Sequence, residues 1–594
     1  MGGFTSKHSH LTAVHDATCG PVKGVGYDQE DGSVVEGFLG VPYAEPPIGA
    51  LRFKKPIAHR RWEEPLECTK FGPRAPQNDE LLGQFVNTVG KSEEHCLSLN
   101  VFTPKWESDE WPNGFPVMVF IHGGGFQVHS SSNYGCATIA RNLCTKNVVA
   151  VTINYRLGVL GFFTTGDSIC PGNMGLWDQT AALQWVQDHI ASFRGDPDNV
   201  TIFGQSAGGA SVDLLCLSPH SNRLFNRAIP MAGNAECDFA IRTSKQQATC
   251  VKSSQDFWDG REVVNDDSEG LLDFIDNQPL YKLEMGINPR RGFRHSQAGS
   301  LYFVPNFDGD FFPKPLSQLR EEVPKMQLMT GTTKYEGLFF IALGALSRNP
   351  EGIKKFMSRI FKKCDYGENS EEALELAYNF YFKGVHPKDQ EKNIQQIVKF
   401  IGDYSINYGT YLFANKMSEL DHDVYFYQFE YHNPGGFGIF RWLLPFLGEF
   451  LFSKFCILGL GSEYETGRKK PRVVYAIATL SLNGAPIPSV RGSTHCTEMR
   501  YVLGKGIISK FKPNESDKKM IEVMTTYFTN FAKYGSPNGQ IDSDSGQWEK
   551  HDSFTPFRHF KIDLEDSEMA EDYQDRRAEL WDKLRALNVT RAQL

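Results

Sequence analysis

A serine between two glycines, in GQSAG at 204–208, is the first feature of the chain that could act as a nucleophile. A serine hydroxyl attacks a carbonyl carbon when a base accepts its proton and amide groups stabilise the negative charge that develops. Small residues also gather in ordinary turns, and a five-residue match does not separate the two cases. The interpretation of Ser206 therefore depends on its flanking elements and on the rest of the chain.

Ser206 stands between a predicted strand and a predicted helix. NVTIF at 199–203 is typical of a strand, and VDLLCL at 212–217 continues a helix. At such an elbow the serine projects from the carboxyl end of the sheet, and glycines two residues to either side leave no Cβ to block the bend. The first amides of the helix then point toward the developing negative charge.

The sequence IHGGGF at 121–126 offers further amide donors. It follows VMVFI at 117–121, an apolar run typical of a buried strand. Consecutive glycines let a backbone approach a ligand closely, and in α/β-hydrolases such a loop completes an oxyanion hole with the amide after the nucleophile. The predicted donors are the amides of Gly124, Gly125 and Ala207.

The wider pattern predicts an α/β fold. Apolar runs suited to strands buried on both faces alternate with segments of helical periodicity, and a mostly parallel sheet covered by helices accounts for this alternation. The predicted strands are 117–121, 147–154, 199–203, 226–233, 325–331 and 423–431, and the predicted helices include 177–195 and 518–535.

Several long stretches resemble the type-B carboxylesterase/lipase family, which includes carboxylesterases, cholinesterases and the catalytically inactive neuroligins. The resemblance implies an α/β-hydrolase fold, with a large central twisted sheet, mostly parallel and flanked by helices, and an active site at the carboxyl ends of the strands. We expect one catalytic domain over 16–594. The stretches are FLGVPYAEPPIGALRFKKP (38–56), EEHCLSLNVFTP (93–104), VVAVTINYRLGVLGFF (148–163) and GNMGLWDQTAALQWVQDHIASFRGDPDNVTIFGQSAGGASV (172–212).

The same resemblance implies an acid and a base for Ser206. The family's acid is a glutamate before a glycine, which matches Glu336 in GTTKYEG, and its base lies in a G-x-x-H-x-x-E pattern, which matches His495 in RGSTHCTEMRYVLG. The chain order Ser, Glu, His is that of α/β-hydrolases. His495 would take the Ser206 proton while Glu336 fixes the ring tautomer. This chemistry needs no metal and no cofactor.

Two departures from the family pattern point away from a cationic substrate. Most members carry Glu before the nucleophile, where this chain has Gln205, and the loop between Cys68 and Cys96 lacks the choline-binding tryptophan of cholinesterases. We therefore expect a carboxylesterase-like enzyme whose partner is a small, uncharged ester. Acyl transfer to an acceptor other than water, a lipase activity and a neuroligin-like adhesion role are the alternatives. The last of these predicts loss of the serine or the histidine, and this chain keeps both.

Cys68 and Cys96 match the family's first disulfide. Closing their loop would stabilise the fold by roughly 3.6 kcal/mol on a chain-entropy model. Disulfides are rare in the cytosol, and for a cytosolic chain we expect this pair to be reduced.

The segment 449–491 is an atypical insertion, because the family has only a short connection before the base. Three interpretations stay open: a lid over the active site, a flap that contacts a membrane, and a retained intron translated in frame. Its irregular composition, without a clear period, slightly favours the third.

Composition and the N-terminus bear on partners and location. A formal net charge of −9 and a pI near 6.0 argue against nucleic-acid binding. We see no secretory signal and no clean apolar stretch of membrane-spanning length, so we expect a cytoplasmic protein. The first residues match the N-myristoylation pattern at Gly2, which predicts a flexible tail over 1–15 and weak, reversible membrane association through an acyl chain. The sequence does not predict an oligomeric state.

Overall fold

The computed structural model describes most of the chain. The predicted acylation site Gly2 and the insertion at 449–491 lie outside the described residues and stay predictions. Among the described residues, no helix combines the length and the apolar character needed to cross a membrane. The described residues are 9–78, 94–253, 267–284, 301–342, 350–433, 492–505, 511–540 and 547–589.

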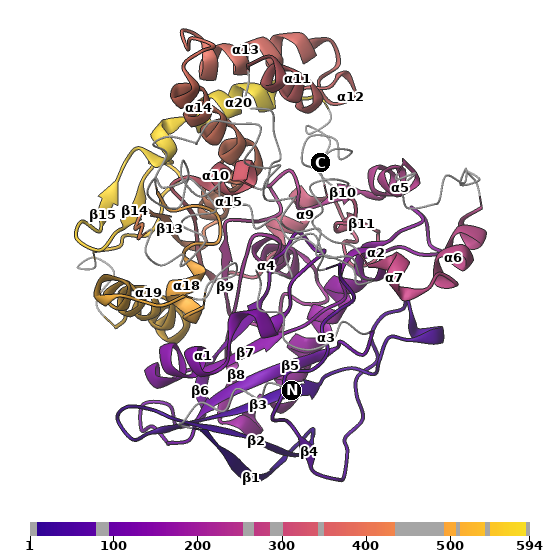
Figure 1. Cartoon of the computed structure of the whole chain (residues 1–594), viewed down its shortest axis with the longest axis vertical. Helices are drawn as coiled ribbons and strands as arrows, with labels where there is room; N and C mark the ends of the chain where they lie inside the picture. Colours follow the sequence, from indigo (N-terminus) through magenta and orange to yellow (C-terminus); the bar gives the residue numbers. More distant parts are fainter. Residues whose placement is uncertain are drawn as a thin grey trace, which may run out of the picture.

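A mixed sheet of 13 strands runs through the molecule in the order β1-β2-β3-β5-β7-β6-β8-β9-β12-β13-β14-β15, with β4 beside β2 (Figure 1). Every pair from β7 to β14 is parallel, and the pairs β1-β2, β2-β3, β3-β5, β5-β7 and β14-β15 are antiparallel. The predicted large, mostly parallel sheet is therefore confirmed. The strands are β1 (Ser9–Ala17), β2 (Gly20–Asp28), β3 (Val34–Pro42), β4 (Leu66–Glu67), β5 (Ser98–Pro104), β6 (Phe115–Ile121), β7 (Val149–Ile153), β8 (Gly195–Gln205), β9 (Arg227–Met231), β12 (Gln327–Thr333), β13 (Asp423–Phe429), β14 (His559–Ile562) and β15 (Glu568–Ala570), and β10 (Arg242–Thr243) pairs with β11 (Asn306–Phe307).

Helices cover both faces of the sheet, as the α/β pattern predicts (Figure 1). The helices are α1 (Ala137–Asn142), α2 (Gly158–Phe162), α3 (Met174–His189), α4 (Ala207–Leu217), α5 (Ser244–Ser253), α6 (Ser268–Asp276), α7 (Leu280–Leu283), α9 (Leu316–Glu321), α10 (Glu336–Ala342), α11 (Pro350–Ile360), α12 (Lys363–Tyr366), α13 (Ser370–Phe382), α14 (Gln390–Gly402), α15 (Tyr408–Glu419), α18 (Met499–Leu503), α19 (Glu515–Tyr534) and α20 (Ala578–Ala586).

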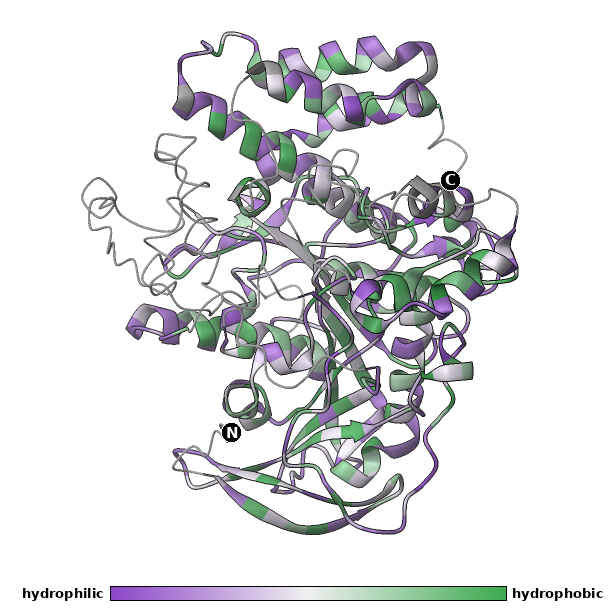
Figure 2. Ribbon diagram, turned by 45° about the vertical axis from the view of Figure 1, so that its right-hand side comes forward, coloured by the Kyte–Doolittle hydropathy of each residue, from purple (hydrophilic) through white to green (hydrophobic). Residues whose placement is uncertain are grey.

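The central strands are apolar along their whole length because side chains on alternate positions enter two different cores. In β6, Val117 and Val119 belong to the core that α3 and α4 complete, and Met118 and Phe120 belong to the core that α1, α18 and α19 complete. Figure 2 shows hydrophobic residues gathered along these strands and on the inner sides of the helices. The sheet is thus a rigid, doubly covered platform for the loops at its carboxyl edge.

The helix α19 shows how local sequence sets its bounds. Asn514 accepts a hydrogen bond from the amide of Asp517, and the Asp517 side chain accepts one from the amide of Asn514, which is a capping box. The helix ends before Gly535, whose φ of 74° suits a residue without a side chain. Its apolar face, with Met524 and Phe528, is buried against the sheet.

The predicted tail over 1–15 is wrong at its C-terminal end, because Ser9–Ala17 form β1. This strand pairs antiparallel with β2, and the Thr12 hydroxyl accepts a hydrogen bond from the amide of Gly24 (2.8 Å). The ring of His15 packs on Phe38 at a centroid distance of 5.7 Å. The position of these residues is set by strand pairing. They contain no apolar run that would reveal a strand in the sequence.

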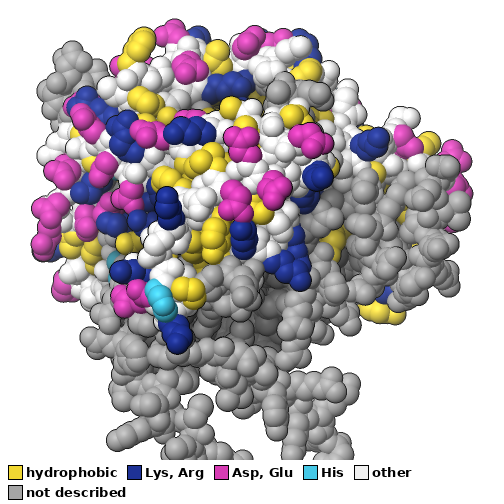
Figure 3. Space-filling model, turned by 90° about the horizontal axis from the view of Figure 1, so that it is seen from above, with side chains coloured by type: hydrophobic (Ala, Val, Ile, Leu, Met, Phe, Trp, Pro, Cys, Tyr) yellow, Lys and Arg dark blue, Asp and Glu magenta, His cyan; other side chains and the backbone are white. Residues whose placement is uncertain are grey.

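Helices α11, α13, α14 and α20 lie together at the top of the view in Figure 1, and α14 packs against α10. Seen from above, the described surface over these helices carries lysine and arginine side chains interspersed with aspartate and glutamate (Figure 3). Charges of both signs, intermixed in this way, are typical of a solvated surface.

Candidate active site

Ser206 lies at the turn between β8 and α4, with φ 60° and ψ −125°, a conformation that a residue with a side chain rarely adopts. The packing around the turn is tight. A Cβ on Gly208 would overlap the carbonyl of Ile121, and a Cβ on Gly204 would lie 2.5 Å from the carbonyl oxygen of Gly208. Glycines at these two positions are therefore what permits the bend.

The loop Gly123–Gly125 follows β6 and lies directly against this turn. A Cβ on Gly123 would stand 3.2 Å from the Cβ of Ser206. Gly124 and Gly125 have φ values of 111° and 62°. Ala207 opens α4, so its amide has no acceptor within the helix. Both predicted donor segments therefore adjoin Ser206.

An aromatic pair anchors the start of this loop. The Tyr155 hydroxyl donates a hydrogen bond to the carbonyl of His122 (2.7 Å), and the two rings stack with centroids 4.5 Å apart. Burial lowers the pKa of His122 to about 3, so this ring is neutral near pH 7. His122 therefore supports the loop as a packed neutral ring.

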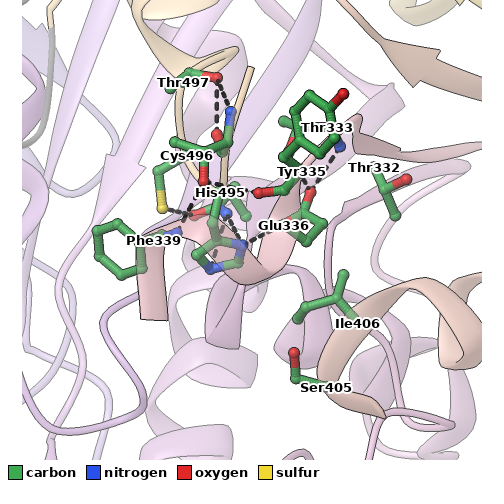
Figure 4. A network of polar contacts seen from close by, with 12 residues as sticks. Thr332, Thr333, Tyr335, Glu336, Phe339, Ser405, Ile406, His495, Cys496 and Thr497 are labelled. Atoms are coloured by element: carbon green, nitrogen blue, oxygen red, sulfur yellow. Dashed lines mark hydrogen bonds and ion pairs between the residues drawn. The ribbon is translucent and has the colours of Figure 1, made fainter. Parts of the chain in front are cut away.

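Glu336 and His495 form a buried pair (Figure 4). Glu336 opens α10, and one of its carboxylate oxygens accepts hydrogen bonds from the amide (2.6 Å) and the hydroxyl (2.9 Å) of Thr333 at the end of β12. The other carboxylate oxygen accepts a hydrogen bond from His495 Nδ1 at 2.6 Å. This bond keeps the proton on Nδ1 and leaves Nε2 as the basic nitrogen.

Hydroxyl groups fix the turn that carries this histidine. The Ser493 hydroxyl accepts a hydrogen bond from the amide of Lys334 (3.2 Å) and donates one to the carbonyl of Phe429 (2.6 Å). The Thr494 hydroxyl accepts a hydrogen bond from the amide of Phe339 (3.0 Å). The turn is therefore tied to the end of β13 and to α10 through side chains.

The rings of Phe339 and Phe340 pack against His495, with centroid distances of 5.5 and 5.1 Å. They place an apolar wall beside the imidazole. Such a wall keeps water from one side of the base and strengthens the electrostatic contact between His495 and Glu336.

The side chain of Gln205, which is 2% exposed, contacts the base. Its Nε2 lies 3.3 Å from His495 Nδ1 and 3.2 Å from His495 Nε2, while its Oε1 accepts a hydrogen bond from the Cys496 thiol (2.9 Å). The sequence reveals Gln205 only as a missing negative charge. Nothing local predicts its contact with a histidine 290 positions away.

Glu498 is a second buried carboxyl beside the pair. Burial, together with the charge of Glu336, raises the pKa of Glu498 to about 8, so it is mostly protonated at pH 7. Sequence reasoning assigned this residue no role, although it is the glutamate of the G-x-x-H-x-x-E pattern that located His495.

The structure brings the predicted acid and base into direct contact, and the residue before the predicted nucleophile, Gln205, contacts the base. Within the described residues, the His495 ring bonds to Glu336 and Gln205, and the Ser206 hydroxyl makes no hydrogen bond. Ser206 adjoins the base through its neighbour Gln205, whose side chain lies on the imidazole.

Cys68 and Cys96 are both buried and carry free thiols in the structure. Burial raises the pKa of Cys68 to about 12 and raises that of Cys96 further. Thiols of this kind stay protonated and react slowly. The structure lacks the disulfide that the resemblance implies, and the redox state of the pair stays a prediction.

A polar cavity of about 260 Å³ lies beside Glu336. Its walls carry paired charges, such as Lys334 with Glu430 (2.6 Å) and Arg577 with Asp575 (2.8 Å). Pockets that take small organic ligands are mostly apolar, so this cavity is poorly suited to an acyl chain. The lining residues are Lys334, Tyr335, Glu336, Val398, Lys399, Asn407, Gln428, Glu430, Lys561, Asp572, Gln574, Asp575 and Arg577.

Comparison with known proteins gives one consistent result. A sequence model described as "Carboxylesterase family" matches residues 12–581. "Esterase cest-33" of Caenorhabditis elegans is 42% identical over 595 residues, which cover 98% of this chain and 96% of that protein. "Cholinesterase" of Mus musculus is 29% identical, covering 97% of this chain and 88% of its own. "Fatty acyl-CoA hydrolase precursor, medium chain" of Anas platyrhynchos is also 29% identical, covering 92% of this chain and 87% of its own.

Proposed function

The chain belongs to the carboxylesterase family and is a serine hydrolase, and we propose that it hydrolyses uncharged carboxylic esters through an acyl-enzyme on Ser206. The observation that carries this proposal is the buried 2.6 Å hydrogen bond between His495 and Glu336, on an imidazole that is also contacted by Gln205, the residue before Ser206. A carboxylate on Nδ1 is what a neutral imidazole needs to act as a general base through Nε2.

The proposed reaction has two symmetric halves. His495 Nε2 takes the Ser206 proton as the serine oxygen forms a bond to the ester carbonyl carbon. The amides of Gly124, Gly125 and Ala207 hold the oxyanion, and the loss of one such donor typically costs about 3–4 kcal/mol. The carbon–alkoxy bond then breaks, and the alcohol leaves with the proton from His495. Water repeats these steps on the acyl-enzyme and releases the acid.

Two features support an uncharged substrate. Gln205 puts a neutral amide beside the nucleophile, and Glu498 is mostly protonated at pH 7, so neither offers a full negative charge to a cation. Phe339 and Phe340 provide apolar surface at the base. A cation gains from a nearby negative charge, which Gln205 and a protonated Glu498 do not supply, whereas a neutral alkyl group gains simply from burial.

A fluorophosphonate probe tests the nucleophile. We expect labelling at Ser206 that Ser206→Ala abolishes and that the control Ser405→Ala retains, because within the described part of the chain the Ser405 hydroxyl bonds the carbonyl of Ile401 in its own helical turn. We expect His495→Ala to hydrolyse a simple aryl ester about a thousandfold more slowly, or slower still. A folded wild-type chain that neither labels nor hydrolyses any ester would contradict the proposal.

A matched pair of esters tests the substrate class. Choline acetate and its neutral isostere, 3,3-dimethylbutyl acetate, differ in charge and hardly in shape. We expect kcat/KM to favour the neutral ester by about tenfold, the scale of a modest electrostatic preference. Equal values, or a preference for choline, would contradict the proposed class.

The acyl-enzyme does not dictate its acceptor, so acyl transfer is the second candidate. Adding a primary alcohol to the assay separates the two functions. We expect free acid to remain the main product. A transferred ester that dominates at millimolar alcohol would identify a transferase.

Cytoplasmic location and N-terminal acylation at Gly2 stay proposals, carried by the start of the sequence alone. Metabolic labelling with an alkynyl myristate tests them together. We expect label and vesicle sedimentation in the wild type and loss of both in Gly2→Ala, and an unlabelled wild type would refute acylation.

A further inference from the structure

The amide nitrogen of Gln205 does not lie in the plane of the His495 imidazole ring. Its amide nitrogen is nearly equidistant from Nδ1 (3.3 Å) and Nε2 (3.2 Å). The in-plane direction at Nδ1 is already occupied by the N–H group that donates to Glu336. An in-plane position equidistant from both nitrogens would collide with the carbon between them, so the amide group lies over a face of the imidazole.

The thiol of Cys496 sets the orientation of that amide. It donates to Gln205 Oε1 at 2.9 Å, which turns the NH₂ end toward the ring (Figure 4 shows Cys496 beside His495). Burial raises the pKa of the Cys496 thiol well above its usual range, so the thiol keeps the proton that it donates.

The backbone conformation at Cys496 is unfavourable for a residue with a side chain. Its φ of 71° lies in the left-handed region, where glycine is favoured and other residues are strained. A glycine would fold there more easily. The contact between the thiol and Gln205 is the feature that a glycine would lose.

We propose that Gln205, oriented by the Cys496 thiol, is a positioning residue that keeps His495 neutral and correctly turned for proton abstraction. This inference rests on the proposed function. The N–H groups of an amide attract the electron-rich face of a neutral imidazole and repel an imidazolium cation. The contact therefore opposes protonation of the free base, and it extends activity toward lower pH.

The other groups around the base fix the direction of the expected effect. Glu336 lies on α10 and Glu498 follows the base in the chain, and both would favour an imidazolium when ionised. Tyr427 of β13 faces both carboxyls, and Tyr573, near the C-terminus, faces Glu336. Burial keeps both phenols protonated. The phenylalanines of α10 carry no charge. Among these neighbours, Gln205 is the group that opposes the charged ring.

The pH dependence of kcat/KM for a naphthyl ester tests the proposal. We expect Gln205→Glu to move the midpoint of the acid limb upward by about one pH unit or more, because a carboxylate then faces the ring. We expect Gln205→Leu to move it upward by a few tenths of a unit. An unmoved midpoint in both variants, or a downward shift in Gln205→Leu, overturns the proposal.

Cys496 gives an independent second arm. Cys496→Gly removes the thiol and relieves the left-handed backbone, so it should fold at least as well as the wild type. We expect it to shift the midpoint in the same direction as Gln205→Leu and to lower kcat severalfold with little change in KM. Cys496→Ser restores a donor and should recover the wild-type profile. Failure of the glycine variant to shift, or of serine to rescue, also overturns the proposal.

A buried glutamine that touches no part of the site is the control. Gln179 of α3 is 0% exposed and donates to the Ser211 hydroxyl (3.1 Å). Gln179→Leu should lower stability and leave the pH midpoint unmoved. Labelling of Ser206 by the fluorophosphonate, measured on the same preparations, keeps the two ideas apart. If the wild type is labelled but the pH midpoints of the Gln205 and Cys496 variants do not move, only the role of Gln205 is refuted. If the wild type is not labelled, the proposed function is refuted.

Discussion

The turns that carry the nucleophile and the base are built on opposite principles. At Ser206 the backbone itself is packed, since a Cβ on Gly208 would overlap the carbonyl of Ile121 in β6. At His495 the hydroxyls of Ser493 and Thr494 hold the turn, together with one backbone hydrogen bond from the amide of Tyr335 to the carbonyl of Ser493 (3.0 Å). The first turn leaves no room for a side chain at Gly208, whereas each side-chain contact of the second turn can be removed separately. The two turns should therefore fail in different ways.

The largest expected effect is at the packed turn. Gly208→Ala forces a methyl group into the backbone of β6, so we expect no soluble enzyme or a free energy of unfolding lowered by about 3 kcal/mol or more, measured by denaturant titration. Gly309→Ala is the control for backbone strain without overlap, because Gly309 has a φ of 77° and open space around it, and this substitution should lower the free energy of unfolding by about 1 kcal/mol. Equal losses in the two variants would contradict the role assigned to packing at Gly208.

At the base turn, the free energy of unfolding should instead depend on pH through Glu498. Glu498 keeps its proton in the folded state up to about pH 8 but releases it near pH 4.5 when unfolded, so wild-type stability falls as pH rises through that window. Glu498→Gln cannot ionise and mimics the protonated form. We expect its stability advantage to be absent near pH 4 and to grow by at most about 1.4 kcal/mol per pH unit up to pH 8.

Urea titrations at pH 4, 6 and 8 would measure this advantage. Glu568→Gln is the control, since Glu568 lies at the surface and pairs with Lys561 at 3.3 Å. It should show no such trend. A constant difference between Glu498→Gln and the wild type at all three pH values would contradict the role assigned to Glu498.

A single hydroxyl of the base turn can be removed without changing the fold. Ser493→Ala removes the hydroxyl that bonds both the amide of Lys334 and the carbonyl of Phe429, while these two groups keep their own hydrogen bond (3.0 Å), so we expect a loss of about 1 kcal/mol in stability. We expect kcat to fall about tenfold with KM nearly unchanged, because the base and not substrate binding is displaced. Ser358→Ala, at an exposed hydroxyl, is the control and should change neither quantity. A rise in KM alone would argue against displacement of the base.

The contrast between the two turns also explains how much the sequence could predict. Gly204, Ser206 and Gly208 form a local pattern, because close backbone packing demands glycine at fixed spacing, and the central strands around them follow from local apolar runs. The contacts of Gln205 with His495 and of Cys496 with Gln205 join residues about 290 positions apart through side chains. No local pattern encodes them.

The same reasoning applies to the start of the chain. The sequence predicts a tail over residues 9–15 because they form no continuous apolar run, and in the structure Leu11 and Val14 of β1 are exposed. Its place in the sheet is set by pairing with β2, which depends on backbone groups common to every residue. Edge strands are for this reason less visible in sequence than central strands.

The smallest expected effect lies between the two turns, at the loop that should hold the oxyanion. This loop is packed against Ser206 like the nucleophile turn, yet one side chain also supports it, the Tyr155 hydroxyl that bonds the carbonyl of His122 at 2.7 Å. If backbone packing positions the loop, Tyr155→Phe should lower kcat only about threefold, well short of the effect of losing a whole oxyanion donor.

Tyr43→Phe is a matched control, because the Tyr43 hydroxyl bonds the carbonyl of Asn154 at the same 2.7 Å. Both variants should lose about 1 kcal/mol of stability, and only Tyr155→Phe should slow the reaction. A loss of a hundredfold or more in Tyr155→Phe would show that the loop, like the base, is held by its side chains.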